Sequence, residues 1–420
     1  MIQITELLPG ITLRCFPDDR FKQSCLSIQL VRPLCAEEAA MNALIPAVLL
    51  RGCKSAPDLR TITLRLDDLY GASVGALVRR VGDLQTTGFY CNFIADRYTL
   101  GGEALLSPMA DFVGQLLLEP VTEKGAFRKD YVESEKKNLI STLQTQLNDK
   151  RAYAGARLME IMCKDDPFGI PRLGRVKDAK QVTAGTLYAH YQAILKESRI
   201  DLFYVGPQPV EQVASVLKPL FERLDRTYIP LPAQTPFRGG QGQDVAETMD
   251  VTQGKLSVGY YTPITSRHPD FAAMQVLNTL FGAGMTSKLF MNIREAQSLC
   301  YDIGSGYYGS KGILTVSAGI DWDKEGSVRA EIEKQLAACQ NGDISPEELS
   351  GAKESLCSSL LGTHDSPGAI EGYYESGALS GLTIPPEAYI ENIQAVTAAD
   401  CARAANTLQR HSSFFLKGDA

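Results

Sequence analysis

The chain has 420 residues and a formal net charge of −7, from 42 Lys and Arg and 49 Asp and Glu side chains. This length exceeds that of one ordinary domain and suits two domains of about 200 residues each. The acidic balance, without a strip of clustered Lys and Arg, argues against a nucleic-acid partner, because phosphate binding requires a concentrated positive patch.

Ten cysteines are scattered along the chain and none forms a C-x-x-C pair, so neither a zinc ribbon nor a thioredoxin-type redox site is expected. The first ten residues lack the basic region and apolar run of a secretory signal. No window approaches about 18 consecutive apolar residues, which argues against a membrane span. We therefore expect a cytoplasmic protein with reduced cysteines and no membrane partner.

The first half of the chain predicts an alternation of strands and helices. Apolar residues at every second position predict strands, and apolar residues three or four apart predict helices. The expected elements are a strand at 26–31, helices near 38–51 and 58–70, strands at 71–80 and 86–95, helices near 103–119, 127–163 and 182–196, a strand at 200–205 and a helix at 208–224.

A composition break at 226–247, with three prolines, three glycines and no apolar period, predicts a linker between domains. The elements expected after it are a strand at 255–262, helices near 269–281 and 285–297, strands at 300–308 and 313–321, helices near 325–340, 346–362, 367–380 and 386–407, and a strand at 412–418.

One order of elements thus occurs twice: a strand, two helices, two strands, further helices and a final strand. This repetition predicts an α+β fold with two homologous domains related by duplication, each a mixed or antiparallel sheet covered by helices. We place the first domain at 1–227, the linker at 228–247 and the second domain at 248–420.

The most informative segment is FGAGMTSKLFMNIREAQSLCYDIGSGYYGSKGILTVSAGID, residues 281–321. Gly282 and Gly284 are expected to break one helix, and Thr286 or Ser287 to cap the next. Four apolar residues at helical spacings are then expected to face a core. They are Met285, Leu289, Phe290 and Ile293.

Arg294 lies at the end of this expected helix, and Tyr301 follows at the start of a strand. A guanidinium and a phenol are both donors, so the pair can bind one peptide carbonyl and stabilise a developing oxyanion. The simpler alternative is that Arg294 pairs with a surface acid while Tyr301 fills a strand position. A phosphate-binding loop is not favoured, because GAGMTSK lacks the glycine before its lysine and follows a helix.

The same segment resembles the second-domain signature of the insulinase/pitrilysin (inverzincin) metallopeptidases, in their short two-domain bacterial branch. The matching residues are Gly282, Gly284, Met285, Ser287, Leu289, Phe290, Arg294, Glu295, Leu299 and Tyr301. The resemblance implies that Arg294 and Tyr301 contact the substrate backbone near the scissile bond. It further implies that Gly282, Gly284 and Ser287 belong to the substrate-binding segment.

The zinc motif of that family is absent. Its H-x-x-E-H sequence places two histidines on one face of a helix, with a glutamate that polarises the zinc-bound water. This chain has four histidines, none within a helical turn of another. Matching the family pattern places Ala43, Pro46 and Ala47 at the motif positions, and Thr142 at the position of the later glutamate ligand. We therefore expect no metal in this chain and no activity of the chain alone.

The resemblance implies a non-catalytic subunit of a heterodimeric peptidase, with zinc held by a homologous partner subunit and Arg294 and Tyr301 completing the site on peptides. The alternative is a catalytically dead peptide-binding or scaffold protein, with self-association as a homodimer. A hydrolase of another type is not favoured, because nucleophiles need a nearby base and the His364–Asp365 pair suits a helix cap.

Overall fold

The computed structural model describes residues 1–418, which fall into two compact units. Unit 1 comprises Met1–Gln144, Ile170–Ala233 and Asp365–Glu375; unit 2 comprises Thr145–Gly169, Gln234–His364 and the segment that begins at Ser376. The units depart from the predicted domains in two places. Residues 145–169 lie in unit 2, and residues 365–375 lie in unit 1.

Unit 1 is built on a six-stranded mixed sheet with the order β1-β2-β8-β3-β5-β4. Its strands are β1 (Gln3–Leu8), β2 (Ile11–Pro17), β3 (Gln23–Pro33), β4 (Ser73–Val81), β5 (Leu84–Ile94) and β8 (Arg199–Gly206). Only the β2–β8 pair is parallel in this sheet. A separate ribbon joins β6 (Thr122–Glu123) to β7 (Ala126–Phe127).

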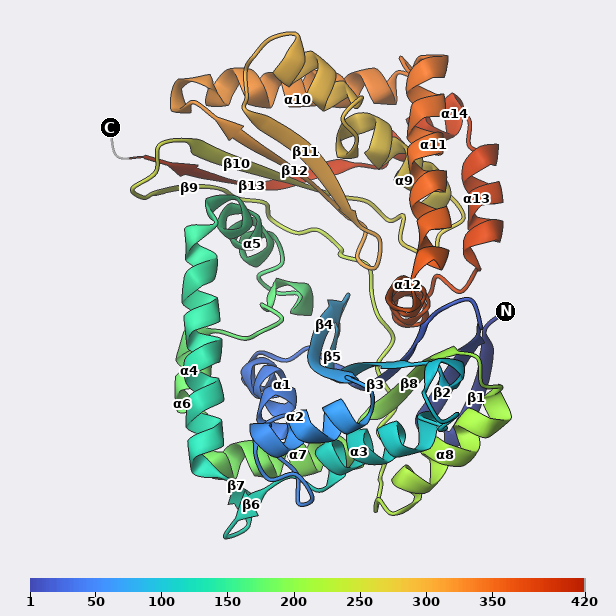
Figure 1. The fold of residues 1–420 in the computed structure, drawn as a ribbon. Helices are drawn as coiled ribbons and strands as arrows, with labels where there is room; N and C mark the ends of the chain where they lie inside the picture. The colour runs from blue at the N-terminus through green and yellow to red at the C-terminus, as the bar shows by residue number, and fades with distance from the viewer. Residues whose placement is uncertain (419–420) are drawn as a thin grey trace. The chain divides into compact units, whose positions relative to one another are not determined.

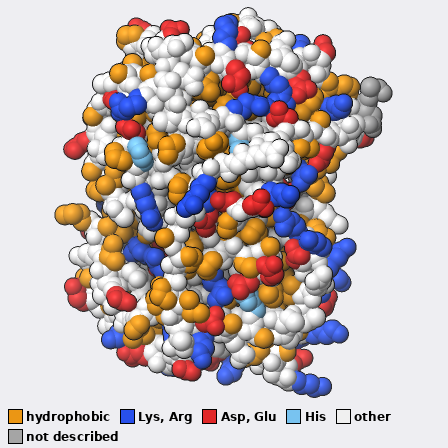
Figure 2. Space-filling view, turned by 180° about the vertical axis from the view of Figure 1, so that it is seen from behind, with side chains coloured by type: hydrophobic (Ala, Val, Ile, Leu, Met, Phe, Trp, Pro, Cys, Tyr) orange, Lys and Arg blue, Asp and Glu red, His pale blue; other side chains and the backbone are white. Residues whose placement is uncertain are grey.

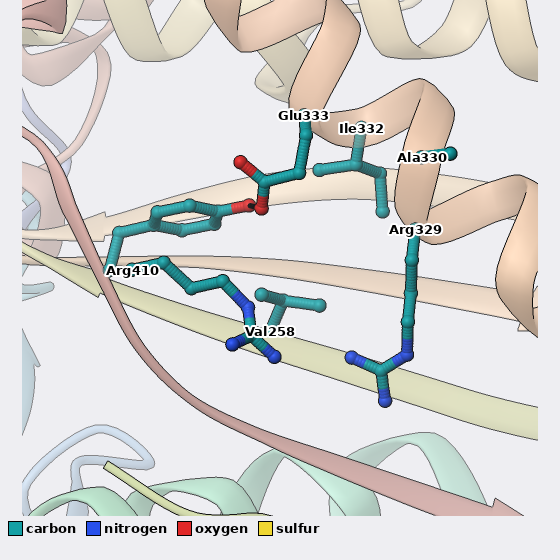
Figure 3. Close-up of a pocket in the computed structure, with 7 residues that line it drawn as sticks. Val258, Arg329, Ala330, Ile332, Glu333 and Arg410 are labelled. Carbon is teal, nitrogen blue, oxygen red and sulfur yellow. Dashed lines mark hydrogen bonds between the residues drawn. The ribbon is translucent and has the colours of Figure 1, made fainter. Parts of the chain in front are cut away.

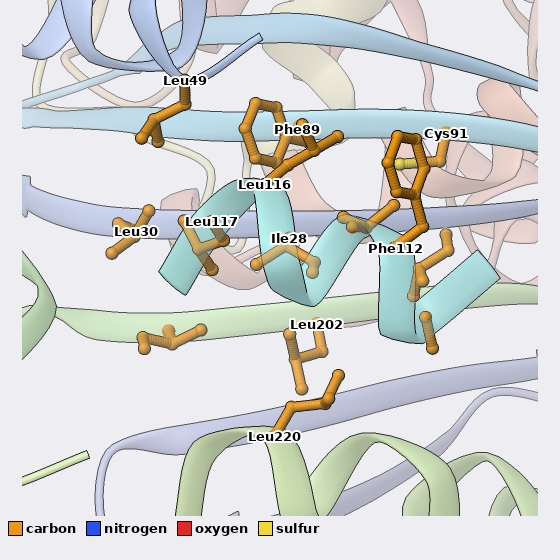
Figure 4. Close-up of a cluster of buried hydrophobic side chains, with 14 of the residues drawn as sticks. Ile28, Leu30, Leu49, Phe89, Cys91, Phe112, Leu116, Leu117, Leu202 and Leu220 are labelled. Atoms are coloured by element: carbon orange, nitrogen blue, oxygen red, sulfur yellow. The ribbon is translucent and has the colours of Figure 1, made fainter. Parts of the chain in front are cut away.

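Helices cover one face of this sheet (Figure 1). The helices of this part of the chain are α1 (Ala36–Leu49), α2 (Leu59–Asp68), α3 (Leu106–Leu118), α4 (Lys129–Thr145), α6 (Val176–Gln181), α7 (Ala184–Glu197) and α8 (Val210–Glu222). Figure 4 shows α3 lying across the strands, with Phe112 and Leu116 directed at Phe89, Ile28 and the neighbouring apolar residues. These side chains are fully or almost fully buried, so the apolar face of α3 contributes strongly to the core.

The opposite face of the sheet carries the first part of α12 (Pro367–Ser380), which comes from the second half of the chain. Its Glu371 carboxylate accepts hydrogen bonds from Ser27 Oγ at 2.9 Å, Gln29 Nε2 at 3.0 Å and the Arg79 guanidinium at 2.7 and 3.0 Å. Because Glu371 has no exposed surface, these bonds replace the water that the carboxylate loses on burial.

A second buried carboxylate lies one turn further along α12. Glu375 is 3.5 Å from Arg14 Nη1, and the same nitrogen is 3.2 Å from Asp201 Oδ1. Arg199 Nε donates to Asp201 at 2.8 Å. The face of unit 1 under α12 therefore combines these polar groups with an apolar cluster around Ile370, whereas the face under α3 is apolar.

Unit 2 is built on a five-stranded sheet with the order β11-β12-β10-β13-β9, in which β11 is an edge strand. Its strands are β9 (Asp244–Thr248), β10 (Gly254–Tyr261), β11 (Asp302–Tyr308), β12 (Ile313–Ile320) and β13 (Gln409–Lys417). Only the β13–β9 pair is parallel.

Successive side chains along β13 point to opposite faces of this sheet. Phe415 faces the large core beneath α9 (Phe271–Asn278), α10 (Glu325–Gln340) and α14 (Ala398–Ala405). Phe414 and Leu416 face the other way and pack against α5 (Lys150–Met162), which comes from the first half of the chain. Helices α11 (Pro346–Leu361) and α13 (Pro386–Ala395) contribute to the same core as α9, α10 and α14.

The α+β class is confirmed, with mixed sheets covered by helices in both units (Figure 1). Two predicted long helices are each broken. Asp149 accepts from two amides and begins α5 as a separate helix after α4, and Thr397 caps α14 after α13. Strands β1 and β2 were not predicted, nor was β9, which begins within the predicted linker.

None of the helices within residues 1–418 has the length and apolar composition that crossing a membrane requires. On the face shown in Figure 2, basic and acidic side chains are interspersed.

Replacing Glu375 with Gln is expected to change the pH dependence of stability. Burial and, to a lesser extent, the nearby Asp201 raise the pKa of Glu375 to about 8, although Arg14 opposes the rise. The folded chain therefore keeps a proton that the unfolded chain releases near its ordinary value of 4.5. The resulting stabilisation is complete below that value and is lost as the pH rises toward about 8.

Glu375→Gln should therefore gain stability relative to the wild type between about pH 5 and pH 8, by at most about 1.4 kcal/mol per pH unit. Thermal or denaturant unfolding across this range measures the difference. Glu391→Gln, at an exposed position of α13, is the matched control and should follow the wild type. A constant difference between Glu375→Gln and the wild type across the range would contradict the assignment.

Candidate functional site

The signature segment of unit 2 forms two π-helical turns. Helix α9 continues into η4 (Thr279–Ala283), the chain turns at Gly284, and η5 (Phe290–Glu295) follows. π-Helical turns are rare in proteins, and those that occur are often found at functional sites. The predicted helix at 285–297 is therefore replaced by a turn and a short π-helix, which places the segment's side chains differently from a regular helix.

The two glycines of this segment have different surroundings. A Cβ at Gly282 would lie 2.7 Å from Leu289 Cδ1 and 2.7 Å from Ser305 Oγ, closer than side-chain contacts allow. A Cβ at Gly284 would meet nothing nearer than 3.6 Å. Gly282 therefore permits close packing of η4 against β11, whereas Gly284 has free space around it.

Only some of the residues of this segment that were expected in the core are buried. Leu289 and Ile293 are fully buried, as predicted, and Phe290 is half-buried. The prediction for Met285 was wrong: its side chain is 79% exposed, because it lies in the turn before the π-helix and not on a helix face. Ser287 is buried, and its Oγ accepts from the Phe290 amide at 3.4 Å.

An open pocket of about 410 Å³ lies beside the edge strand β11. Its lining comes from the glycine turn, from η5, from the strands β11 and β12, and from α5. The residues are Arg151, Gly282, Ala283, Gly284, Met285, Phe290, Ile303, Gly304, Ser305, Gly306, Thr315 and Ser317. A free strand edge with adjacent side-chain pockets is the arrangement that binds an extended peptide by strand addition.

Arg151 is the cationic group of this pocket and was not predicted. Its guanidinium lies 2.9 Å from Asp302 Oδ2, at the beginning of β11. Both side chains are partly exposed, so the ion pair contributes little to stability and can exchange partners. Only the fold of unit 2 brings residue 151 to this strand, and no local sequence pattern indicates it.

At the surface of unit 2, Tyr301 is exposed and Arg294 is partly exposed. Arg294 lies over the Phe290 ring, 4.6 Å from its centroid, and 3.6 Å from Glu295 Oε1. The Tyr301 hydroxyl donates to Asp321 Oδ1 at 2.8 Å, and Asp321 also binds Lys324 Nζ at 2.9 Å. Within residues 1–418, no hydrogen bond joins the two predicted donors to each other.

The bend before Tyr301 is held by Ser298, whose φ is 50°. A positive φ is uncommon for a residue other than glycine and is typical of strained functional turns. The Ser298 and Leu299 amides donate back to η5, and the Tyr301 amide donates to Gly319 O at 2.8 Å. The backbone of Tyr301 is thus fixed by the sheet while its phenol stays exposed. The bond to Asp321 raises the pKa of this phenol, so it remains a donor at neutral pH.

The positions matched to the zinc motif lie in unit 1. Ala43 and Pro46 are buried on α1, Ala47 is half-buried, and Thr142 is exposed on α4, where its hydroxyl bonds the Asn138 carbonyl. None of these side chains is a zinc ligand.

A hydrogen-bond network occupies the neighbourhood of these α1 positions. His190 Nε2 lies 2.7 Å from Asn42 Oδ1, and Asn42 Nδ2 donates to Gln85 Oε1 at 2.8 Å. Burial lowers the pKa of His190, which favours the neutral ring in this amide network. Among the described residues 1–418, no three His, Cys, Asp or Glu side chains lie together as metal ligands.

Gly282→Ala is expected to destabilise unit 2, because the added methyl group must displace Leu289 or Ser305. Overpacking of this kind costs about 1–3 kcal/mol. Gly284→Ala is the matched control, since its methyl group enters open space. Thermal unfolding of the two variants tests the difference, and equal melting temperatures would contradict the close packing of η4 on β11.

Comparison with known proteins identifies the family. Residues 181–356 match the family described as "Peptidase M16 inactive domain". The chain is 33% identical over 409 residues to the "Probable inactive metalloprotease YmfF" of Bacillus subtilis (strain 168), covering 97% of this chain and 96% of that protein.

Solved structures agree in fold. A conserved protein from Enterococcus faecalis V583 superposes with a TM-score of 0.91 and 28% identity, covering 100% of this chain and 99% of that chain. The peptidase M16 inactive domain from Pseudomonas fluorescens gives 0.82 at 16% identity, covering 100% and 98%. With the signature of unit 2 in place and H-x-x-E-H absent, this chain belongs to the M16, insulinase-type family of metallopeptidases.

Proposed function

We propose that this chain is the non-catalytic subunit of a heterodimeric zinc metallopeptidase that acts on peptides. Arg294 and Tyr301 would complete the site of a zinc-bearing homologous subunit. The observation that carries the proposal is a contrast between the two units. The signature turn is retained beside an open pocket, whereas the zinc positions hold Ala43, Pro46, Ala47 and Thr142.

The exposure of both donors supports this role. Arg294 and Tyr301 rest against Phe290 and Asp321, which are neighbours within the same segment of unit 2. Each contact lies at the surface, so a side-chain rotation frees the guanidinium or the phenol at small cost. Two donors aimed at one carbonyl oxygen stabilise the oxyanion of peptide hydrolysis more than the ground-state carbonyl.

The edge strand β11 offers the second element of the proposed role. A peptide in extended form can add to this edge through backbone hydrogen bonds, with side chains entering the adjacent pocket. The flat surface over Gly304 and Gly306 leaves room for the peptide backbone to approach closely. Zinc, bound in the partner subunit, would polarise the scissile carbonyl and the attacking water.

The second candidate is a catalytically inactive peptide-binding or scaffold protein, which forms a homodimer. The resting contacts favour it in one respect, because both donors already have neighbours within this chain. In that case the pocket beside β11 would bind peptides without any contribution to hydrolysis.

Reconstitution tests the proposal. Peptide hydrolysis is measured for this chain, for a family member from the same genome that carries H-x-x-E-H, and for their mixture. The zinc content of each protein is measured as well. We expect hydrolysis by the mixture alone and zinc in the H-x-x-E-H chain alone. Arg294→Ala and Tyr301→Phe should each lower kcat of the mixture by about 10²–10³-fold, the usual effect of losing one oxyanion donor.

Matched controls separate this effect from folding. Arg60→Ala and Tyr98→Phe remove equivalent groups at exposed positions of unit 1 and should leave the rate unchanged. All four variants should melt within about 2 °C of the wild type, because exposed positions are changed. A mixture that is no faster than the zinc-bearing chain, with no association between the chains, would overturn the heterodimer and favour the scaffold role.

A further inference from the structure

A second pocket in unit 2, of about 230 Å³, lies between α10 and the strands β10 and β13 (Figure 3). It is lined by Val258, Tyr260, Ile332, Ala330, Arg329, Glu333 and Arg410. None of these residues belongs to the signature turn or to the pocket beside β11. The volume is below the range of about 300–1,000 Å³ that is usual for drug-sized ligands, so the pocket suits a small group.

The inner wall of this pocket is apolar. Val258 and Tyr260 are two residues apart on β10, so both side chains face α10. Val258, Tyr260 and Ile332 are almost fully buried. Tyr260 presents its ring to the pocket because its hydroxyl is already bonded to Glu333 Oε1 at 2.7 Å. This wall therefore favours an aliphatic group over a hydrated one.

The guanidinium groups of Arg329 and Arg410 both line the pocket and are drawn below Val258 in Figure 3. Arg410 uses Nη2 to bind Asp244 at 2.6 Å, and Arg329 uses Nε and Nη2 to bind Glu325 at 2.8 Å. Within the described part of the chain, no hydrogen bond is made by Nε and Nη1 of Arg410 or by Nη1 of Arg329. These N–H groups are not buried.

The acidic partners Asp244 and Glu325 each bind one guanidinium and lie outside the set of lining residues. The carboxylate that lines the pocket is Glu333, which accepts the hydrogen bond from Tyr260. The like charges of Arg329 and Arg410 are thereby kept in place, with free N–H groups available to an added anion. A carboxylate matches such paired, planar donors better than a neutral group does.

We propose that this pocket binds the terminal carboxylate of an aliphatic amino acid, with the carboxylate between Arg329 and Arg410 and the side chain against Val258 and Ile332. The ligand chemistry is shared by a free aliphatic amino acid and by the C-terminal residue of a peptide. Inorganic phosphate can meet the guanidinium groups but has no aliphatic group to bury against the inner wall. A long fatty acid exceeds the volume of the pocket.

Calorimetric or NMR titration of the full chain tests the proposal with N-acetyl-leucine, which carries the carboxylate, and N-acetyl-leucinamide, which does not. We expect saturable binding of the acid and at least about tenfold weaker binding of the amide, because hydrogen bonds to a charged group are worth about 1.5–3 kcal/mol. Free leucine and a pentapeptide ending in leucine distinguish the two sources, and tighter binding of either one supports the site.

Substitutions in the pocket test whether N-acetyl-leucine binds there. Arg329→Gln and Arg410→Gln should each weaken N-acetyl-leucine binding by about tenfold or more, whereas Arg223→Gln, an exposed control in unit 1, should not. Because Arg410→Gln also removes the Asp244 contact, Ala330→Leu provides a second test at an exposed position of the rim. It narrows the pocket without removing an ion pair and should also weaken binding.

Three results would overturn the proposal. They are equal affinity for the acid and the amide, no saturable binding of the acid up to about 10 mM (a Kd too weak for two charged hydrogen bonds), and unchanged affinity in both arginine variants.

Discussion

Glu371 is a carboxylate without exposed surface, and its burial determines how unit 1 is completed. A buried charge is tolerated only when its oxygens are fully bonded, and Ser27 and Gln29 of β3 and Arg79 of β4 supply those bonds. The same face also holds an apolar cluster that packs against Ile370, so α12 meets the sheet through polar and apolar contacts. The pairing fixes the position of α12 on the sheet and makes a late segment of the chain part of the first unit.

The two units differ in which family motifs are present: unit 1 lacks the zinc motif, and unit 2 has the signature segment. On α1, Ala43 and Pro46 are packed in the core, and the polar groups nearby are satisfied by Asn42, Gln85 and His190. The α1 segment is therefore packed and hydrogen-bonded by side chains of unit 1 itself. In unit 2 the π-helical turns, the close packing at Gly282 and the positive φ of Ser298 maintain a costly local geometry. Strain of this kind persists where a function requires it.

Most of the fold and one part of the site could be predicted from the sequence, because strong periodicity and a specific motif are local properties. Helices such as α10 and α12 have the expected bounds. The breaks at Asp149 and Thr397 depend on single capping residues within long apolar patterns, which periodicity does not resolve. The pairing of Arg151 with Asp302 joins residues far apart in the sequence, so it follows from tertiary packing alone. Met285 was misplaced because the chain forms a turn between η4 and η5, where a continuous helix was predicted.

Because residues 365–375 belong to unit 1 and residues 145–169 to unit 2, the order of folding during synthesis is also constrained. Domains generally fold as units while the chain emerges from the ribosome, the N-terminal one first. Unit 1 includes residues up to Glu375, so its sheet cannot receive α12 until nearly nine-tenths of the 420 residues have been made. Until then the buried face with Ser27, Gln29 and Asp201 is open to water, and the nascent chain carries an unfinished first unit through most of its translation.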